Sequence, residues 1–123
     1  MLPSVSVVIC AYSLDRWDDL AAAVASVRAQ APPPLETIVV VDHNDALLER
    51  AQRELQATVV ASSGAPGLSH ARNAGIAAAQ GEIVAFLDDD AAAEHGWLAA
   101  LVRPYADPAV LAVGGAVEPR WLA

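Results

Sequence analysis

Short, nearly uninterrupted apolar runs alternate along the chain with longer segments in which apolar residues recur every three or four positions. The short runs are rich in Val and Ile, which is typical of strands that are buried on both faces of a parallel sheet. We predict strands over residues 5–11, 37–41, 58–61 and 83–87, and the beginning of a fifth strand over residues 110–113.

The segments between these strands carry good helix formers at helical spacing. We predict helices over residues 20–30, 45–55, 69–80 and 94–105. Residues 15–19 offer capping groups before the first helix, three prolines at 32–34 end it, and Gly81 ends the third helix. Strands that alternate with helices indicate an α/β domain in which helices flank a mostly parallel sheet.

The composition indicates a packed core. The chain has 123 residues, of which 55% are hydrophobic and 18% are charged, so we expect one small folded domain. The mean hydropathy of +0.37 is high for a small domain, either because alanine is abundant or because further polypeptide covers part of the surface. A new element begins at residues 118–123 without a closing helix, so we expect a truncated domain whose exposed face favours self-association.

The net charge, the single cysteine and the absence of a long apolar stretch indicate which partners and which cellular location to expect. The net charge is −8 and no basic run exists, which argues against a nucleic-acid partner. Cys10 lies in an apolar run and has no second cysteine to pair with, which fits a reducing cytoplasm. Because the chain shows no signal peptide and no apolar stretch of about 20 residues, we expect a soluble, cytoplasmic chain without a membrane segment.

Polar residues follow three of the predicted strands. Tyr12 and Ser13 follow the first strand, residues 42–45 (DHND) follow the second, and residues 88–90 (DDD) follow the fourth. Ligands of open parallel sheets bind at the carboxyl ends of the strands. The three polar segments are therefore predicted to face one crevice.

The acidic triplet is the strongest single signal in the sequence. Adjacent carboxylates repel one another, and a divalent cation relieves that repulsion. Mg²⁺ or Mn²⁺ prefers oxygen ligands, and Mg²⁺ typically takes one or two carboxylates together with substrate phosphates. Asp88 and Asp90 stand two residues apart, so in an extended segment they point to the same side. The alternative is a solvated acidic turn that caps the following helix.

A glycine-containing loop before the third helix offers a phosphate site. Residues 67–75 read GLSHARNAG, which places Arg72 and Asn73 on the first turns of the helix. Helix N-termini attract phosphate, and an arginine adds a fork of donors. The alternative is a surface helix capped by Ser69, with Arg72 in an ordinary ion pair.

Four segments, in this order, resemble the nucleotide-binding half of inverting family 2 glycosyltransferases, which have the GT-A fold. They read VSVVICAY, VVVDHND, GLSHARNAG and GEIVAFLDDD, and the resemblance covers nearly the whole chain. It implies that a sugar is transferred, with inversion, from a nucleotide-sugar donor to an acceptor, with the assistance of Mg²⁺ or Mn²⁺.

The resemblance also assigns roles to individual residues. It implies that nucleotide-sugar binding involves Ala11, Tyr12, Asp42, His43, Arg72, Asn73, Asp88 and Asp89. It makes Asp90 the expected metal ligand, with Asp88 beside it. Many relatives carry a carboxylate at the position of His43, so a uracil-containing donor is not assured here; a surface turn is the other interpretation of His43.

The general base of such enzymes stands in the second half of the domain, which implies that it lies beyond residue 123. We therefore expect this chain by itself to bind donor weakly and to catalyse poorly or not at all. The alternatives are a non-catalytic nucleotide-binding or partner-binding module, a haloacid-dehalogenase phosphatase and a Rossmann dehydrogenase. The phosphatase motif normally follows the first strand, and no G-x-G-x-x-G follows that strand here.

Overall fold

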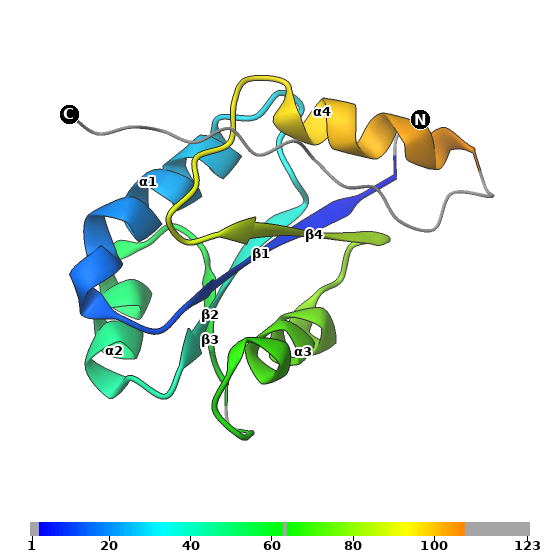
Figure 1. The fold of residues 1–123 in the computed structure, drawn as a ribbon. Helices are drawn as coiled ribbons and strands as arrows, with labels where there is room; N and C mark the ends of the chain where they lie inside the picture. The colour runs from blue at the N-terminus through cyan, green and yellow to red at the C-terminus, as the bar shows by residue number, and fades with distance from the viewer. Residues whose placement is uncertain (1–2, 63, 108–123) are drawn as a thin grey trace.

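Strands and helices alternate along the chain as the apolar pattern predicts (Figure 1). The computed structural model describes residues 3–62 and 64–107. The strands in these residues are β1 (Val5–Ala11), β2 (Glu36–Asp42), β3 (Thr58–Ser62) and β4 (Ile83–Asp88). The helices are α1 (Trp17–Arg28), α2 (Asp45–Glu54), α3 (Leu68–Ala78) and α4 (Trp97–Val102), with the 3₁₀ turns η1 (Leu14–Arg16) and η2 (Arg103–Ala106).

The four strands form one parallel sheet in the order β3-β2-β1-β4. Their register brings the carboxyl ends together, because Ala11 pairs with Val41 and Cys10 pairs with Asp88. Asp42, the last residue of β2, pairs with Ser62 of β3. The predicted α/β architecture is therefore confirmed, and the polar segments that follow the strands share one edge.

Side chains alternate between the two faces of the sheet and produce two cores. On one face, Val7 and Ile9 of β1 belong to a cluster that also contains buried residues of α1, α2 and α4. On the other face, Val8 packs with residues of β2 and with Ala71 of α3. Gly75 lets α3 come close to the sheet, because a Cβ atom there would lie 2.5 Å from Cγ1 of Val8.

Several boundaries differ from the sequence-based expectation for local reasons. The helix expected over residues 94–105 begins at Trp97, because Gly96 takes a left-handed conformation with φ of 82° directly before it. No side chain caps α1; instead the Oγ atom of Ser13 accepts a hydrogen bond from the backbone N–H of Asp15 in η1. The expected fifth strand over residues 110–113 lies outside the described residues.

Candidate functional site

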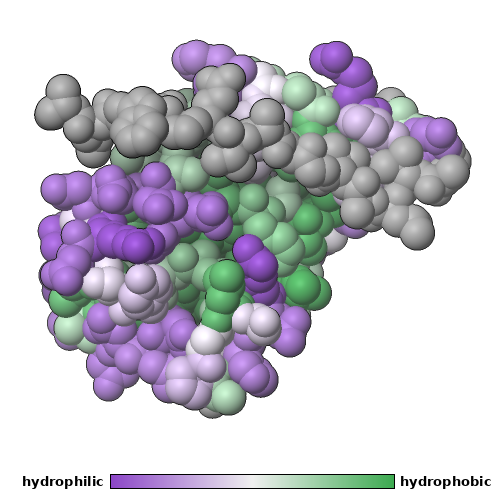
Figure 2. Space-filling model, viewed as in Figure 1, coloured by the Kyte–Doolittle hydropathy of each residue, from purple (hydrophilic) through white to green (hydrophobic). Residues whose placement is uncertain are grey.

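The carboxyl edge of the sheet carries the candidate site. Figure 2 shows hydrophilic surface gathered on the side of the molecule where the strands end, while hydrophobic surface lies in the middle of the view. Tyr12, which follows β1, is 57% exposed. Ala11 is buried in the core, so only its backbone can face a ligand at this edge. The structure thus presents the phenol ring of Tyr12 as the open platform at the end of β1.

The segment after β2 is attached to the segment after β1. Asn44 caps α2, because its Oδ1 atom accepts a hydrogen bond of 3.0 Å from the backbone N–H of Leu47. Its Nδ2 atom donates to the backbone carbonyl of Tyr12 over 3.2 Å. A single amide side chain therefore sets the spacing between the two turns that line the edge.

Both carboxylate oxygens of Asp42 are engaged within the protein. Oδ1 pairs with Nδ1 of His43, and Oδ2 accepts a hydrogen bond of 2.9 Å from the backbone N–H of Gly67 at the start of α3. The hydrogen bond from His43, followed by that from Gly67, lowers the pKa of Asp42 below its ordinary value. His43 has a left-handed backbone with φ of 50°, and this pairing orients its ring. Asp42 thus links the end of β2 to the loop before α3.

Replacing Asp42 by Asn should lower the free energy of unfolding by about 1–2 kcal/mol at neutral pH, because hydrogen bonds to a charged group are lost. The folded pKa of Asp42 is depressed, so its stabilising contribution is present above the ordinary value of 3.8 and is lost as the pH falls through the folded pKa. Urea denaturation of both proteins across this pH range checks the prediction. A difference that does not shrink on acidification would contradict it.

The acidic turn after β4 separates its three carboxylates. Asp88 and Asp90 are exposed, whereas Asp89 is only 5% exposed. Nη1 of Arg16 lies 3.2 Å from Oδ1 of Asp89 and 3.9 Å from Oδ2 of Asp90. Burial raises the pKa of Asp89, and the hydrogen bond from Arg16 opposes part of that shift. Two carboxylates are therefore open to a ligand, and the middle one is directed inward.

The polypeptide that leaves the acidic turn is held against α1. The buried side chain of Gln30 donates to the backbone carbonyl of Glu94 over 2.8 Å and accepts from the backbone N–H of Leu98 over 3.0 Å. The hydroxyl of Ser26 accepts a hydrogen bond of 2.9 Å from the backbone N–H of Ala93. Side chains in the last turns of α1 and just after that helix thus fix the route of the chain after the carboxylates.

The start of α3 is where the sequence predicts a phosphate site. Gly67, with φ of 127°, precedes the helix, and no side chain caps it; the alternative cap, Ser69, lies inside the helix. Arg72 and Asn73 are exposed on the first turns, and the Arg72 guanidinium lies 5.4 Å from the centre of the Phe86 ring of β4. This interaction directs Arg72 across the helix toward the strand that ends in the acidic turn.

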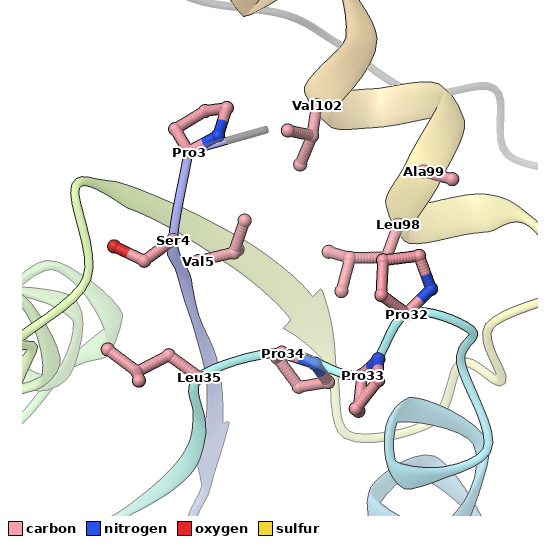
Figure 3. A pocket seen from close by; sticks show the side chains of 10 residues that line it. All are labelled: Pro3, Ser4, Val5, Pro32, Pro33, Pro34, Leu35, Leu98, Ala99 and Val102. Carbon is pink, nitrogen blue, oxygen red and sulfur yellow. The ribbon is translucent and has the colours of Figure 1, made fainter. Parts of the chain in front are cut away.

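Two hollows lie at opposite edges of the described part of the molecule. A hollow of about 230 Å³ at the carboxyl edge lies between β2, β3 and α2, and His43, Asn44, Asp45 and Ser62 are among its lining residues. A hollow of about 250 Å³ at the amino edge is lined mainly by Pro32, Pro33, Pro34, Leu98 and Val102 (Figure 3). None of the described residues that line the second hollow has an ionisable side chain.

Comparison with known protein families shows which family the chain belongs to. The family model described as "Glycosyl transferase family 2" matches residues 6–121. The chain belongs to this family. Membership excludes the phosphatase and dehydrogenase interpretations.

Two curated relatives illustrate the match. The glucosyl-dolichyl phosphate glucuronosyltransferase of Haloferax volcanii is 39% identical over 124 residues, covering 97% of this chain and 40% of that protein. The mouse polypeptide N-acetylgalactosaminyltransferase 12 is 37% identical over 110 residues, covering 83% of this chain and 19% of that protein. This family 2 chain thus spans less than half the length of either relative.

The solved structure of residues 1–349 of TarS from S. aureus has the same fold. It superposes with a TM-score of 0.62 at 24% sequence identity, over 84% of this chain and 33% of the solved 1–349 chain. The GT-A-type fold expected from the sequence is therefore confirmed.

None of the helices in residues 3–62 and 64–107 combines the length and the hydrophobicity that a membrane-spanning helix requires.

The structure adds three side chains to the site that sequence reasoning missed. Arg16, Ser26 and Gln30 all contact the acidic turn or the chain that follows it. Each is separated by more than 60 residues from its partner, so no local motif marks it. The residues expected to bind donor and metal lie at the predicted edge, and their roles stay predictions.

Proposed function

We propose that this chain carries the donor half of a family 2 glycosyltransferase site, which binds a nucleotide-sugar at the carboxyl edge of the sheet. One observation carries the proposal: the exposed carboxylates of Asp88 and Asp90, the exposed ring of Tyr12 and the uncapped start of α3 lie at the same edge. A nucleotide-sugar has an aromatic base, a ribose and two phosphates, and this edge offers groups suited to each.

The carboxylates at this edge fit a divalent cation that shares its coordination with substrate. In residues 3–62 and 64–107, no three His, Cys, Asp or Glu side chains form a group that could hold a metal ion. Mg²⁺ characteristically takes one or two carboxylates and completes its shell with phosphate oxygens and water. Asp90, which is 55% exposed in its side chain, and Asp88 are suited to that role.

The proposed reaction gives each group of this chain a task. Tyr12 and the turn after β2 hold the base and ribose, and Arg72 and Asn73 lie beside the phosphates. A cation on Asp90 and Asp88 would act as a Lewis acid that stabilises the departing nucleoside diphosphate. Inversion requires a carboxylate that accepts the proton of the acceptor hydroxyl, and we propose that polypeptide beyond residue 123 supplies it.

Calorimetric titration of the chain with UDP, GDP and dTDP, each with Mn²⁺ and with EDTA, tests this function. We expect one of the nucleotides to bind at least about tenfold more tightly in Mn²⁺, because the cation offsets repulsion between phosphate and carboxylates. A titration with inorganic phosphate is the control for binding without the base. The Haloferax relative makes a glucuronosyl nucleotide the first sugar donor to compare with the preferred diphosphate.

If the nucleotide binds equally tightly in Mn²⁺ and in EDTA, a cation does not take part in binding and that part of the proposal is wrong. Folded chain that binds no nucleotide in Mn²⁺ would contradict the donor site, and the same titration on a longer chain would show whether the second half completes it. Metal-dependent binding with a clear base preference would support the site and reveal how the turn at His43 selects the base.

A further inference from the structure

One arginine contacts both the turn after β1 and the acidic turn after β4. The Arg16 guanidinium lies 5.4 Å from the centre of the Tyr12 ring, within the range of a cation–π interaction. The same guanidinium lies 3.2 Å from the buried carboxylate of Asp89 and 3.9 Å from the exposed carboxylate of Asp90. Arg16 therefore stands between the proposed base platform and the proposed metal ligand.

The burial of Asp89 distinguishes this contact from an ordinary surface ion pair. The Asp89 side chain is 6% exposed, whereas that of Arg16 is 42% exposed, so the arginine reaches inward from the surface to a desolvated carboxylate. A buried carboxylate without a cationic partner is strongly unfavourable. Arg16 is the cationic partner of Asp89 in this inward orientation, through Oδ1; Oδ2 of Asp89 is buried and has no hydrogen-bond partner among the described residues.

The backbone before Arg16 is itself held in place. The hydroxyl of Ser13 accepts a hydrogen bond of 3.1 Å from the backbone N–H of Asp15, and the Ser13 carbonyl accepts one of 3.4 Å from the N–H of Arg16. The turn η1 thus leads from Tyr12 to Arg16 through a capped, hydrogen-bonded segment. Movement of Asp89 would be transmitted to Tyr12 through the guanidinium and this turn.

We propose that Arg16 is a positioning residue of the donor site, which acts through Asp89 to set the position of Asp90 relative to the ring of Tyr12. Its effect on nucleotide binding rests on the proposed function, whereas the coupling between Asp89 and Tyr12 does not require a bound ligand. The pair Arg16–Asp89 fastens the turn after β1 to the turn after β4, and these are the turns that a nucleoside diphosphate would bridge.

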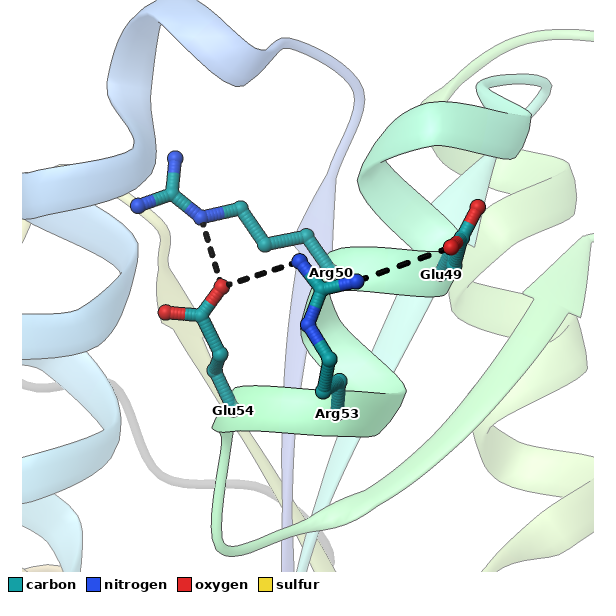
Figure 4. Close-up of polar contacts among 4 residues, drawn as sticks. All are labelled: Glu49, Arg50, Arg53 and Glu54. Atoms are coloured by element: carbon teal, nitrogen blue, oxygen red, sulfur yellow. Dashed lines mark hydrogen bonds and ion pairs between the residues drawn. The ribbon is translucent and has the colours of Figure 1, made fainter.

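Arg50 of α2 provides a matched control (Figure 4). Its guanidinium lies 4.1 Å from the centre of the Trp17 ring, and its Nε atom donates to Glu54 over 3.0 Å. Like Arg16, it combines an aromatic contact with an ion pair, and its side chain is 40% exposed. Its carboxylate partner is on the same helix, so Arg50→Met removes an aromatic contact and an ion pair of the same kinds while leaving the Arg16–Asp89 pair in place.

The first measurement follows the NMR signals of the Tyr12 ring in Asp89→Asn, in Arg16→Met and in the double variant. Asp89→Asn should shift the Tyr12 signals when Arg16 is present and leave them unchanged in the Arg16→Met background. Arg50→Met should leave the NMR signals of the Tyr12 ring unchanged. A role in stability alone would not produce this dependence of one substitution on the other.

The second measurement titrates each variant with the preferred nucleoside diphosphate in Mn²⁺. Arg16→Met and Asp89→Asn should each weaken binding by about 10- to 100-fold, as is typical for residues that orient a metal ligand. The affinity of the double variant for the nucleotide should be no lower than that of the single variant that binds it less tightly. Arg50→Met should bind the nucleotide as tightly as the wild type.

Losses that simply add in the double variant, or Tyr12 signals that ignore Asp89→Asn, would overturn the inference. If the wild-type chain binds no nucleotide, the donor function fails, and the NMR comparison still decides whether Arg16 couples the two turns. The two failures are therefore distinguishable.

Discussion

Replacing Asp90 by Asn should weaken the binding of the preferred nucleoside diphosphate in Mn²⁺ by at least about 100-fold and change it little in EDTA. The Asp90 carboxylate is exposed at the edge where the phosphates are proposed to lie. Asparagine keeps the size of the side chain but removes the negative charge that holds the cation. Paired calorimetric titrations with and without Mn²⁺ measure both affinities.

Asp18, which is exposed on the first turn of α1, offers a control for general electrostatics. Asp18→Asn changes the net charge by the same amount as Asp90→Asn, and we expect it to leave both affinities nearly unchanged. Equal losses in Mn²⁺ and in EDTA for Asp90→Asn would contradict a role as metal ligand. They would indicate direct contact between Asp90 and the nucleotide instead.

Replacing Gln30 by Leu should lower the free energy of unfolding by about 1–3 kcal/mol. Gln30 is 5% exposed, and its side chain bonds the backbone carbonyl of Glu94 and the backbone N–H of Leu98. Leucine fills a similar volume but leaves the buried N–H of Leu98 without this partner, at a cost of about 1–3 kcal/mol. The Glu94 carbonyl still accepts a hydrogen bond of 3.0 Å from the backbone N–H of Trp97. Urea denaturation measures the change.

The exposed Gln52 of α2 is the matched control for the same chemical change. Gln52→Leu should alter the free energy of unfolding by no more than about 0.5 kcal/mol, as expected for an exposed helical site. If the two substitutions lower the free energy of unfolding by the same amount, the hydrogen bonds of Gln30 do not stabilise the segment after the acidic turn.

The sequence could reveal the site only to the extent that its residues are neighbours along the chain. Asp88 and Asp90 stand out because adjacent carboxylates are unfavourable without a partner, and Arg72 stands out because it opens a helix. Nothing local marks Arg16 or Gln30, since an arginine in a polar turn and a glutamine near a helix end are ordinary surface residues in most sequences.

The burial of Asp89 was equally outside the reach of sequence reasoning. The triplet reads as three equivalent carboxylates, and the resemblance to family 2 glycosyltransferases assigns Asp89, with Asp88, to nucleotide-sugar binding. In the structure its side chain is 6% exposed and faces Arg16. Which carboxylate of an acidic turn faces inward depends on the side chains that another segment brings to the sheet, so the local pattern leaves it open.

By itself, the sequence determined the order of strands and helices, the parallel character of the sheet and the edge that carries the polar residues. These follow from short-range properties: hydrophobic periodicity, helix-ending prolines and glycines, and the rule that parallel strands present their carboxyl ends together. The pairing of Arg16 with Asp89, the engagement of Asp42 by His43 and Gly67, and the anchoring by Gln30 of the segment after the acidic turn appear only in the tertiary structure. Apart from the contact between the sequence neighbours Asp42 and His43, each of these depends on the strand order β3-β2-β1-β4, which brings segments far apart in the chain within hydrogen-bonding distance.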